Sequence, residues 1–166
     1  MINAGIQIGS GSVVDTYSTY GLIYLSSDNI LQAPSKGFEK TSYPEEAGDH
    51  VLPKTVDASF EYKVQFLIEA PNTDLANANA KIKAFNNALY TQATGSDVKV
   101  FSQISLYNYY KRVKIVGIPS PISEATEFFR DKRGVQYDAV KVELVINVDN
   151  PKLCNFDYHD TTNNGD

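Results

Sequence analysis

The 166-residue sequence contains no tryptophan, a single methionine and a single cysteine. Because Cys154 stands alone, no disulfide bond can form within the chain, which is compatible with a reducing compartment. No apolar run approaches about 18 residues, so we expect no membrane-spanning segment and no membrane partner. Residues 1–14 lack the basic start and the apolar core of a signal peptide, and we therefore expect a protein made in the cytoplasm.

Large basic blocks are also missing. The formal net charge is −5 and the isoelectric point is near 5.0, which argues against specific nucleic-acid binding. The densest basic cluster consists of Lys111, Arg112 and Lys114, in a predicted strand. These side chains can bind phosphate, but a solvated strand face is the interpretation that we favour.

Aromatic residues, in contrast, are plentiful, with 11 Tyr and 8 Phe. They favour strands, whose pleated surface accommodates flat rings. The chain length suits one domain with its own core. We divide the sequence into an N-terminal arm (residues 1–18), a β-rich domain (residues 19–152) and a polar C-terminal tail (residues 153–166), and we expect residues 157–166 to be disordered.

Strict alternation of apolar and polar residues marks two long strands, at residues 56–68 and 135–148. One buried face and one wet face are typical of an antiparallel sheet. The apolar face of the first strand comprises Val56, Ala58, Phe60, Tyr62, Val64, Phe66 and Ile68. Shorter strands are predicted at residues 21–25, 38–43, 98–101, 104–110, 112–118 and 126–130, the last forming a hairpin with residues 135–148.

Residues 74–91 form the one predicted helix. Asn72 or Thr73 is expected to cap its first turn, and Gly95 to end it. Asn and Lys residues on the other faces indicate a helix that lies on a sheet. Its apolar stripe comprises Leu75, Ala78, Ile82, Phe85 and Leu89. The sequence therefore predicts a β-rich α+β fold, an antiparallel split β-barrel or sandwich with one packed α-helix.

The N-terminal arm is rich in Gly and Ser, and its apolar anchors are Ile6, Ile8, Val13 and Val14. Such a segment gains most by lying along an exposed sheet edge of another subunit, where main-chain hydrogen bonds supply affinity. Tyr107 and Tyr109 share one face of their predicted strand, and Tyr is favoured at interfaces. These six residues are our candidate subunit interface.

Residues with catalytic chemistry are few. His50 lies beside Glu45, Glu46 and Asp49 in a charged Pro/Gly loop, where an acid–base site is possible in principle. A solvated loop tip is the interpretation that we favour. We predict no catalytic residue and no enzymatic activity.

The C-terminal residues Cys154, Asp157, His159 and Asp160 have metal-ligating side chains. They lack the second, closely spaced ligand pair that is typical of zinc sites. We therefore predict no metal site and no cofactor.

The order of the predicted elements resembles a known family. A short strand pair precedes the charged loop at residues 43–50, and the long strand that follows contains FEYKVQFLIE at residues 60–69. After the helix, LYNYYKRVKI at residues 106–115 leads into GIPSPI at residues 117–122 and a long closing hairpin. Over residues 20–150 this pattern resembles the N-terminal domain of phage distal tail proteins and the related tail-tube fold.

The resemblance implies a split β-barrel whose copies form a homohexameric ring around the tail channel. It implies a structural virion protein of a phage or prophage tail, made in the bacterial host cytoplasm, with itself and other tail proteins as partners. Distal tail proteins often carry a second, carbohydrate-binding-like domain, which these 166 residues do not accommodate. The position as distal ring, tube subunit or neighbour of the tail terminator therefore stays open. The acidic net charge suits a channel that passes DNA without binding it.

Two other classes stay open beside this one. The first is a non-catalytic carbohydrate- or protein-binding β-module that uses Tyr and Phe as stacking platforms. The second is a small enzyme that uses the loop at residues 45–50. A hexamer in light scattering favours the tail protein, whereas a monomer that binds glycans favours the module.

Overall fold

A computed structural model of the chain describes residues 4–29, 34–42, 49–92 and 97–156. The elements follow in the order β1 (Ala4–Ile8), β2 (Val14–Asp15), α1 (Thr16–Tyr20), β3 (Leu22–Ser27), β4 (Ser35–Ser42), β5 (Asp49–Asp57), β6 (Phe60–Glu69), the 3-10 turn η1 (Pro71–Thr73), α2 (Leu75–Ala88), β7 (Tyr90–Gln92), β8 (Lys99–Phe101), β9 (Ile104–Asn108), β10 (Val113–Pro119), β11 (Ala139–Val148) and the 3-10 turn η2 (Pro151–Leu153).

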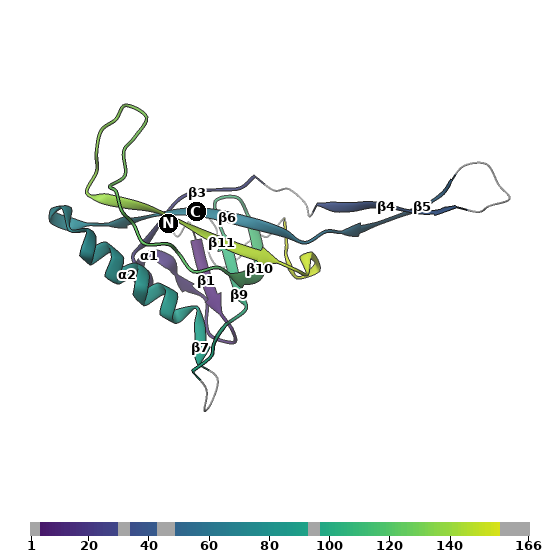
Figure 1. Cartoon of the computed structure of the whole chain (residues 1–166), viewed down its shortest axis with the longest axis horizontal. Helices are drawn as coiled ribbons and strands as arrows, with labels where there is room; N and C mark the ends of the chain where they lie inside the picture. Colours follow the sequence, from purple (N-terminus) through teal and green to yellow (C-terminus); the bar gives the residue numbers. More distant parts are fainter. Residues whose placement is uncertain (1–3, 30–33, 43–48, 93–96, 157–166) are drawn as a thin grey trace.

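Within the described ranges, seven strands form one antiparallel sheet in the order β2-β1-β9-β10-β11-β6-β3, while β4–β5 and β7–β8 form two-stranded hairpins (Figure 1). The β-rich α+β class predicted from alternation is confirmed. The described strands include no ladder between β3 and either β1 or β2, so strand pairing does not close the sheet into a barrel. The sheet is therefore open between its two edge strands.

The sheet has two halves that meet at a corner between β10 and β11. These strands pair at Ile118 with Asn147 and at Pro119 with Ile146, whereas the preceding part of β10 pairs with β9. A Cβ atom on Gly117 would lie 2.9 Å from Cγ2 of Ile146 and would also clash with the backbone carbonyl of Asn147. Glycine is therefore required where the two strands approach this closely.

The core lies on the apolar faces of β6 and β11 that the alternation predicted. Four residues of β6 are fully buried: Tyr62, Val64, Phe66 and Ile68. The register pairs each with a buried residue of β11, and the side chains between them on β6, Lys63, Gln65 and Leu67, are exposed or partly exposed. Other elements complete the same core with Ile6, Ala78, Ile82, Phe85, Leu89, Ile104, Leu106 and Ile115.

The single long strand predicted at residues 56–68 is two strands. β5 ends at Asp57, and β6 begins at Phe60. The N–H of Ala58 donates to the carbonyl of Pro34 at 2.6 Å and closes the base of the β4–β5 hairpin. Alternation continues across the junction, so the sequence pattern alone does not distinguish one bent strand from two consecutive strands.

The structure places the N-terminal segment inside the domain and not in an arm. β1 is an inner strand that pairs with β9 over Ala4–Ile8 and with β2 on its other side. Its apolar residues alternate toward the core, and Ile6 is only 1% exposed. The predicted arm is therefore corrected: these residues are too apolar and too regularly spaced to leave their own sheet.

The polar C-terminal tail also begins later than residue 153. Asn155 and Lys114 exchange two backbone hydrogen bonds, of 2.7 and 2.8 Å. They lie beside the first part of β10, which pairs with β9 and not with β11. The ring of Phe156 packs 6.2 Å from that of Phe60. The residues predicted to be disordered, 157–166, lie outside the described part of the chain.

Helix α2 confirms the predicted helix and its apolar stripe, with Ala78, Ile82 and Phe85 buried. Its N-cap is Asp74, whose carboxylate accepts from the N–H groups of Ala76 and Asn77 at 3.0 and 3.3 Å. A carboxylate at this position also suits the positive end of the helix dipole.

The prediction that Asn72 or Thr73 caps α2 is wrong. Both residues have positive φ values, of 59° and 54°, and belong to the turn before the helix. The helix ends at Ala88, and Gly95, predicted to end it, lies outside the described residues.

A short helix that the sequence analysis did not predict, α1, connects β2 to β3. Asp15 caps it, and Gly21 ends it with a φ of 74°. The buried hydroxyl of Thr16 donates to the carbonyl of Leu22 at 3.0 Å and lies 3.5 Å from that of Ala4. Helix α1 therefore links β1, on one side of the sheet, to β3, on the other, two sides between which the described strands form no ladder.

Two segments project from opposite ends of the body in Figure 1: the β4–β5 hairpin and residues 121–138, drawn in green between β10 and β11. In the second, the predicted pairing of residues 126–130 with 135–148 consists of an isolated bridge between Arg130 and Gln136 and of backbone hydrogen bonds from Phe129 to Ala139 and from Tyr137 to Phe129, without a regular strand at residues 126–130. None of the helices in the described part of the chain is long and apolar enough to cross a membrane.

Candidate assembly surfaces

Three of the six predicted interface residues come together over the outer face of β1: Val13 just before β2, Tyr107 in β9 and Tyr109 in the turn that follows β9. The rings of Tyr107 and Tyr109 stack with centroids 6.2 Å apart. A Cβ atom on Gly5 would lie 3.0 Å from the Tyr109 hydroxyl and 3.1 Å from Cγ1 of Val13, so the absent side chain of Gly5 brings these two residues together. We call Val13, Tyr107 and Tyr109 the aromatic patch.

The neighbours of the aromatic patch hold it in place. The Tyr107 hydroxyl donates to Oε1 of Gln7 at 3.5 Å, and Nζ of Lys114 lies 5.5 Å above the Tyr107 ring. Val13 is 43% exposed, whereas Tyr107 is only 9% exposed. The patch therefore offers a small exposed apolar area on a rigid base.

The remaining predicted interface residues point the other way. Ile6 is buried in the core, and Ile8 and Val14 pack against it. Ile6 and Val14 are register partners in β1 and β2, so both face inward. Ile6 is therefore corrected from an interface residue to a core residue, whereas Ile8 and Val14 are partly buried at the edge of that core, since alternation sends neighbouring positions to opposite faces of a sheet.

A buried polar network lies where β3, β6 and β9 meet. Nδ2 of Asn108 donates to Oγ of Ser27 at 2.8 Å and lies 3.2 Å from the Tyr62 hydroxyl. The Tyr62 hydroxyl donates to the same Ser27 oxygen at 3.0 Å. Burial of Tyr62 raises the pKa of its phenol, so this group stays neutral. The network holds the end of β3, from which the chain leaves for the β4–β5 hairpin.

The predicted basic cluster is dispersed in the structure. The ammonium of Lys111 donates to the Ser27 carbonyl and to Oδ1 of Asn29, at and just after the end of β3. Lys114 lies over the Tyr107 ring, and Arg112 is exposed with a φ of 57° in the β9–β10 turn. The three bases do not converge on one point.

The β4–β5 hairpin pairs with itself alone among the described strands. Its register runs from Ser35 opposite Asp57 to Ser42 opposite Asp49, with shifts on both sides of Phe38. Pro53 falls inside the second shift, where a strand residue without an N–H is tolerated. Both outer edges of this hairpin are therefore without a neighbouring strand in the described part of the chain.

The segment after β10 is tied to α2 by two asparagines. Asn86 accepts from the N–H of Ile122 and donates to its carbonyl, both at 2.9 Å. Asn79 does the same with Ala125, at 2.9 and 3.1 Å. These contacts fix the base of the projection at residues 121–138.

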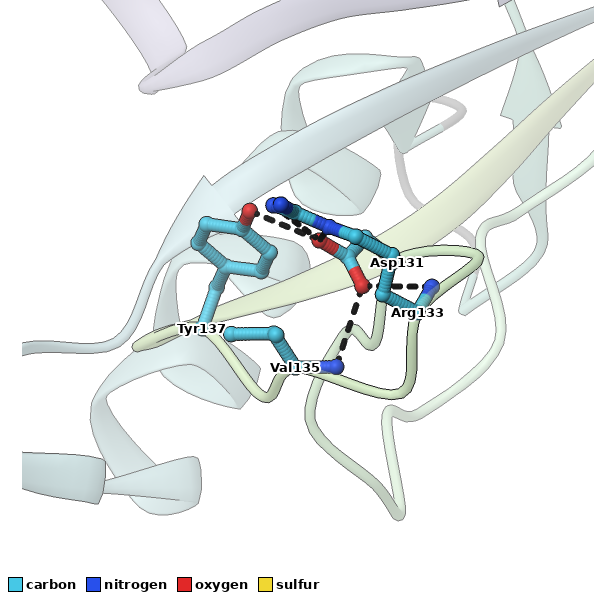
Figure 2. Close-up of polar contacts among 4 residues, drawn as sticks. All are labelled: Asp131, Arg133, Val135 and Tyr137. Carbon is cyan, nitrogen blue, oxygen red and sulfur yellow. Dashed lines mark hydrogen bonds and ion pairs between the residues drawn. The ribbon is translucent and has the colours of Figure 1, made fainter.

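The tip of this projection is organised by Asp131 (Figure 2). Its carboxylate accepts from the N–H groups of Arg133 and Val135 at 2.9 and 3.0 Å and from the Tyr137 hydroxyl at 3.0 Å. The Arg133 guanidinium pairs with it at 3.2 Å. The hydrogen bond from Val135, followed by those from Tyr137 and Arg133, lowers the pKa of Asp131 below its ordinary value.

The residues of the possible acid–base site at His50 are described only in part, by the backbone of β5. His50 lies in β5 opposite Thr41, and Asp49 opposite Ser42, in a strand and not in a loop tip. Glu45 and Glu46 lie outside the described residues. Asp49 and His50 are therefore corrected from loop residues to strand residues.

Of the possible metal ligands, Cys154 is half-buried and Asp157, His159 and Asp160 lie outside the described residues. The Cys154 thiol accepts from the N–H of Val116 at 3.3 Å, and burial raises its pKa. The described residues contain no group of three His, Cys, Asp or Glu side chains placed to hold a metal ion.

An open pocket of about 520 Å³ lies between α1 and α2. It is lined by Tyr17, Tyr20, Glu69, Lys81 and Phe85, among others. The Tyr17 hydroxyl donates to the Glu69 carboxylate at 3.4 Å, and Tyr20 packs edge-on against Phe85 at 5.0 Å. This pocket combines aromatic surface with a carboxylate and an ammonium group.

Sequence reasoning missed the contacts of Asn79 and Asn86 and those of the Asp131 carboxylate. The turn from Asp131 to Gly134 itself follows from the sequence, because Asp at the first and Gly at the fourth position are typical of a type I turn. For the two asparagines no signal existed, because their partners are backbone groups far away in the sequence.

No protein-family model matches the chain, and no curated protein is similar enough in sequence to indicate a relative.

Proposed function

We propose that the protein is a structural component of a phage or prophage tail, in the tail tube or in the distal tail ring at the baseplate hub. Copies of the chain form a ring around the tail channel and contact other tail proteins, without catalysis, cofactor or specific nucleic-acid binding. The protein is made in the bacterial host cytoplasm and resides in the virion tail. The order of elements, which resembles the tail-tube fold, supports this function.

The observation that carries the proposal is the β4–β5 hairpin. Its strands have 8 and 9 residues, a reach of roughly 27 Å at the usual rise per residue. A two-stranded hairpin is marginally stable in water, and an uncovered edge invites pairing with another chain. A hairpin of this length is therefore suited to lie against a partner.

A second copy of the chain is the partner that best fits a marginally stable hairpin with uncovered edges. A contact in which the hairpin of one copy lies on the body of the next is head-to-tail, and such contacts close into a ring when the rotation allows. The register shifts around Phe38 twist the hairpin and protect it from uncontrolled edge pairing. The resemblance suggests six subunits.

The mass of the purified full chain tests this function. Light scattering and native mass spectrometry over a range of concentrations should show a closed oligomer, and negative-stain images should show rings. A monomer at all accessible concentrations would contradict the proposal.

A hairpin-deleted variant sharpens the test. Pro34 and Ala58 are already joined by a hydrogen bond of 2.6 Å, so a short Gly-Ser link can replace residues 35–57 and leave the body intact. This variant should keep its circular dichroism signal and its cooperative unfolding but remain monomeric. A hairpin-deleted variant that assembles as well as the full chain would show that the hairpin is not part of the interface.

The pocket between α1 and α2 favours a second candidate, a non-catalytic carbohydrate-binding module. Tyr17 is 51% exposed beside Glu69 and Lys81, and sugars bind by stacking on aromatic rings and hydrogen bonding to charged groups. A glycan array probed with the wild-type chain and with Tyr17→Ala tests it. A monomer whose glycan binding depends on Tyr17 would favour the module over the tail protein.

A further inference from the structure

We infer that the tip of the projection at residues 121–138 is a contact surface for a second copy of this chain, where it binds the acidic base of the same projection. We call Arg130, Lys132, Val135 and Tyr137 the basic tip, and Glu124, Glu127 and Asp138 the acidic base. This inference rests on the proposed assembly of copies and names one of its contacts.

The tip is held in one shape before any partner arrives. The backbone turn closes with a hydrogen bond from the N–H of Gly134 to the carbonyl of Asp131 at 3.0 Å, and the Asp131 carboxylate then binds Arg133, Val135 and Tyr137 (Figure 2). An ordered tip loses little conformational freedom on binding, which favours affinity.

The tip presents positive charge that nothing within it neutralises. The only carboxylate of the tip, on Asp131, is paired with Arg133. Arg130 binds the neutral oxygens of Gly134 and Gln136, at 3.3 and 2.9 Å, so its charge persists, and Lys132 is exposed. A surface with two uncompensated cations on a chain of net charge −5 is suited to an acidic partner.

Apolar surface beside the cations indicates a protein partner. Val135 is 47% exposed and Tyr137 is 42% exposed. Tyr and Arg are enriched in the residues that dominate protein–protein binding energy. A phosphate backbone would use the cations and leave Val135 without a partner, so a protein surface fits this tip better than nucleic acid.

The base of the same projection carries the opposite charge. Glu124, Glu127 and Asp138 are all exposed. Glu124 also lies at a groove of about 330 Å³ between α2 and the projection, which is lined by Ile82 and Ile122 and by the polar side chains of Asn79, Lys83, Asn86 and Asn87. One chain therefore offers both a basic tip with apolar side chains and an exposed surface with three carboxylates.

The projection keeps one shape within a molecule. Backbone hydrogen bonds from the N–H of Phe129 to the carbonyl of Ala139 and from the N–H of Tyr137 to the carbonyl of Phe129, at 2.7 and 2.9 Å, hold its two sides together. In the described part of the chain the carboxylates of the acidic base form no ion pair with the basic tip, so both surfaces stay available to another copy. Because tip and base are different surfaces, the contact is compatible with a closed ring.

Charge reversal and rescue test this contact. Tip reversal (Arg130→Glu with Lys132→Glu) and base reversal (Glu124→Lys with Glu127→Lys) should each raise the dissociation constant of assembly by roughly tenfold or more, since like charges then face each other. Combining all four changes should restore assembly toward the wild-type level. Lys152→Glu, also at an exposed lysine but outside the projection, is the matched control and should assemble like the wild type.

The measurement is sedimentation velocity at about 0.15 M salt, where longer-range charge effects are screened, with circular dichroism to verify folding. Lys132→Glu alone, which leaves the Arg130 hydrogen bonds intact, should weaken assembly in the same direction. If the wild type assembles and tip reversal changes nothing, or the combined variant shows no rescue, the inference fails while the proposed ring stands. A wild type that never assembles would contradict the proposed function itself.

Binding of a fluorescent DNA duplex that tip reversal abolishes would overturn the inference in favour of a phosphate partner.

Discussion

The side chain of Asn86 binds the backbone of Ile122 as a neighbouring strand would, with one hydrogen bond donated and one accepted, both of 2.9 Å. Asn79 repeats the arrangement with Ala125. Seven helical residues rise about 10.5 Å, and three extended residues span roughly 10 Å. The two asparagines therefore match the backbone spacing of a segment that runs antiparallel to the helix.

Removing this carboxamide should destabilise the protein. Asn86→Ala leaves both the N–H and the carbonyl of Ile122 without their partners in a partly buried position, which we expect to reduce the free energy of unfolding by about 1–3 kcal/mol. Urea denaturation followed by circular dichroism measures it.

Asn77→Ala is the matched control, because Asn77 lies on an exposed face of the same helix and alanine has a higher helix propensity. This variant should be neutral or slightly stabilising. If Asn86→Ala is as harmless as Asn77→Ala, the carboxamide pair does not hold the projection.

The helix illustrates what the sequence can and cannot predict. Periodicity correctly predicts that Ile82 and Phe85 are buried, because apolar side chains at helical spacing form the face of a helix that packs on the core. The same reasoning assigned Asn79 and Asn86 to solvent along with Asn77. An asparagine that pairs with distant backbone has the same sequence pattern as one that faces water, so only the fold distinguishes them.

The N-terminus shows a second limit. A Gly-rich segment with few apolar residues was interpreted as an arm, yet Gly5 is small because Tyr109 and Val13 occupy the space above it. That requirement is set by tertiary contacts and is absent from local composition. The buried faces of β6 and β11 were predictable because each strand repeats one pattern over ten residues, whereas β1 offers only five residues.

The revised role of β1 predicts that Ile6→Ala destabilises the fold. The side chain is 1% exposed in the core, so its truncation should cost about 2–5 kcal/mol. Val13→Ala, at a residue that is 43% exposed, should cost much less. Deletion of residues 1–14 should unfold the chain. A truncated protein that stays folded and loses only assembly would show that these residues are an arm and not part of the core.

Phe85 should be among the most sensitive positions of α2. It is fully buried, and its ring meets that of Tyr20 edge-on at a centroid distance of 5.0 Å. Phe85→Ala removes this contact and leaves a cavity, so we expect a loss of about 3–5 kcal/mol in chemical denaturation. An unchanged midpoint would mean that the helix does not pack on the sheet as described.

Gly117 should tolerate no side chain. An alanine Cβ would press against Ile146 and the carbonyl of Asn147, and these are rigid parts of β11 and not the flexible end of a side chain. We expect Gly117→Ala to cost about 1–3 kcal/mol through overpacking at the sheet corner. Gly134→Ala is an instructive comparison, because that position has open space but a φ of 84°, so its cost is local to the tip. Equal stability of Gly117→Ala and wild type in thermal unfolding would show that the corner relaxes freely.

The order of the basic tip should depend on pH through Asp131. Hydrogen bonds from Val135, Tyr137 and Arg133 lower the pKa of this carboxyl below its ordinary value of 3.8. A lowered folded-state pKa means that the stabilisation is fully present above about pH 3.8 and is lost as pH falls through the lower, folded-state value. The backbone amides of Arg133 and Val135 should accordingly shift together in NMR spectra on acidification, below the range in which exposed carboxyls titrate. Asp131→Asn keeps the side-chain shape and removes the titrating group, so the same amides should lose this pH response. Amide shifts that follow an ordinary carboxyl titration, or that persist in Asp131→Asn, would show that another group controls the tip.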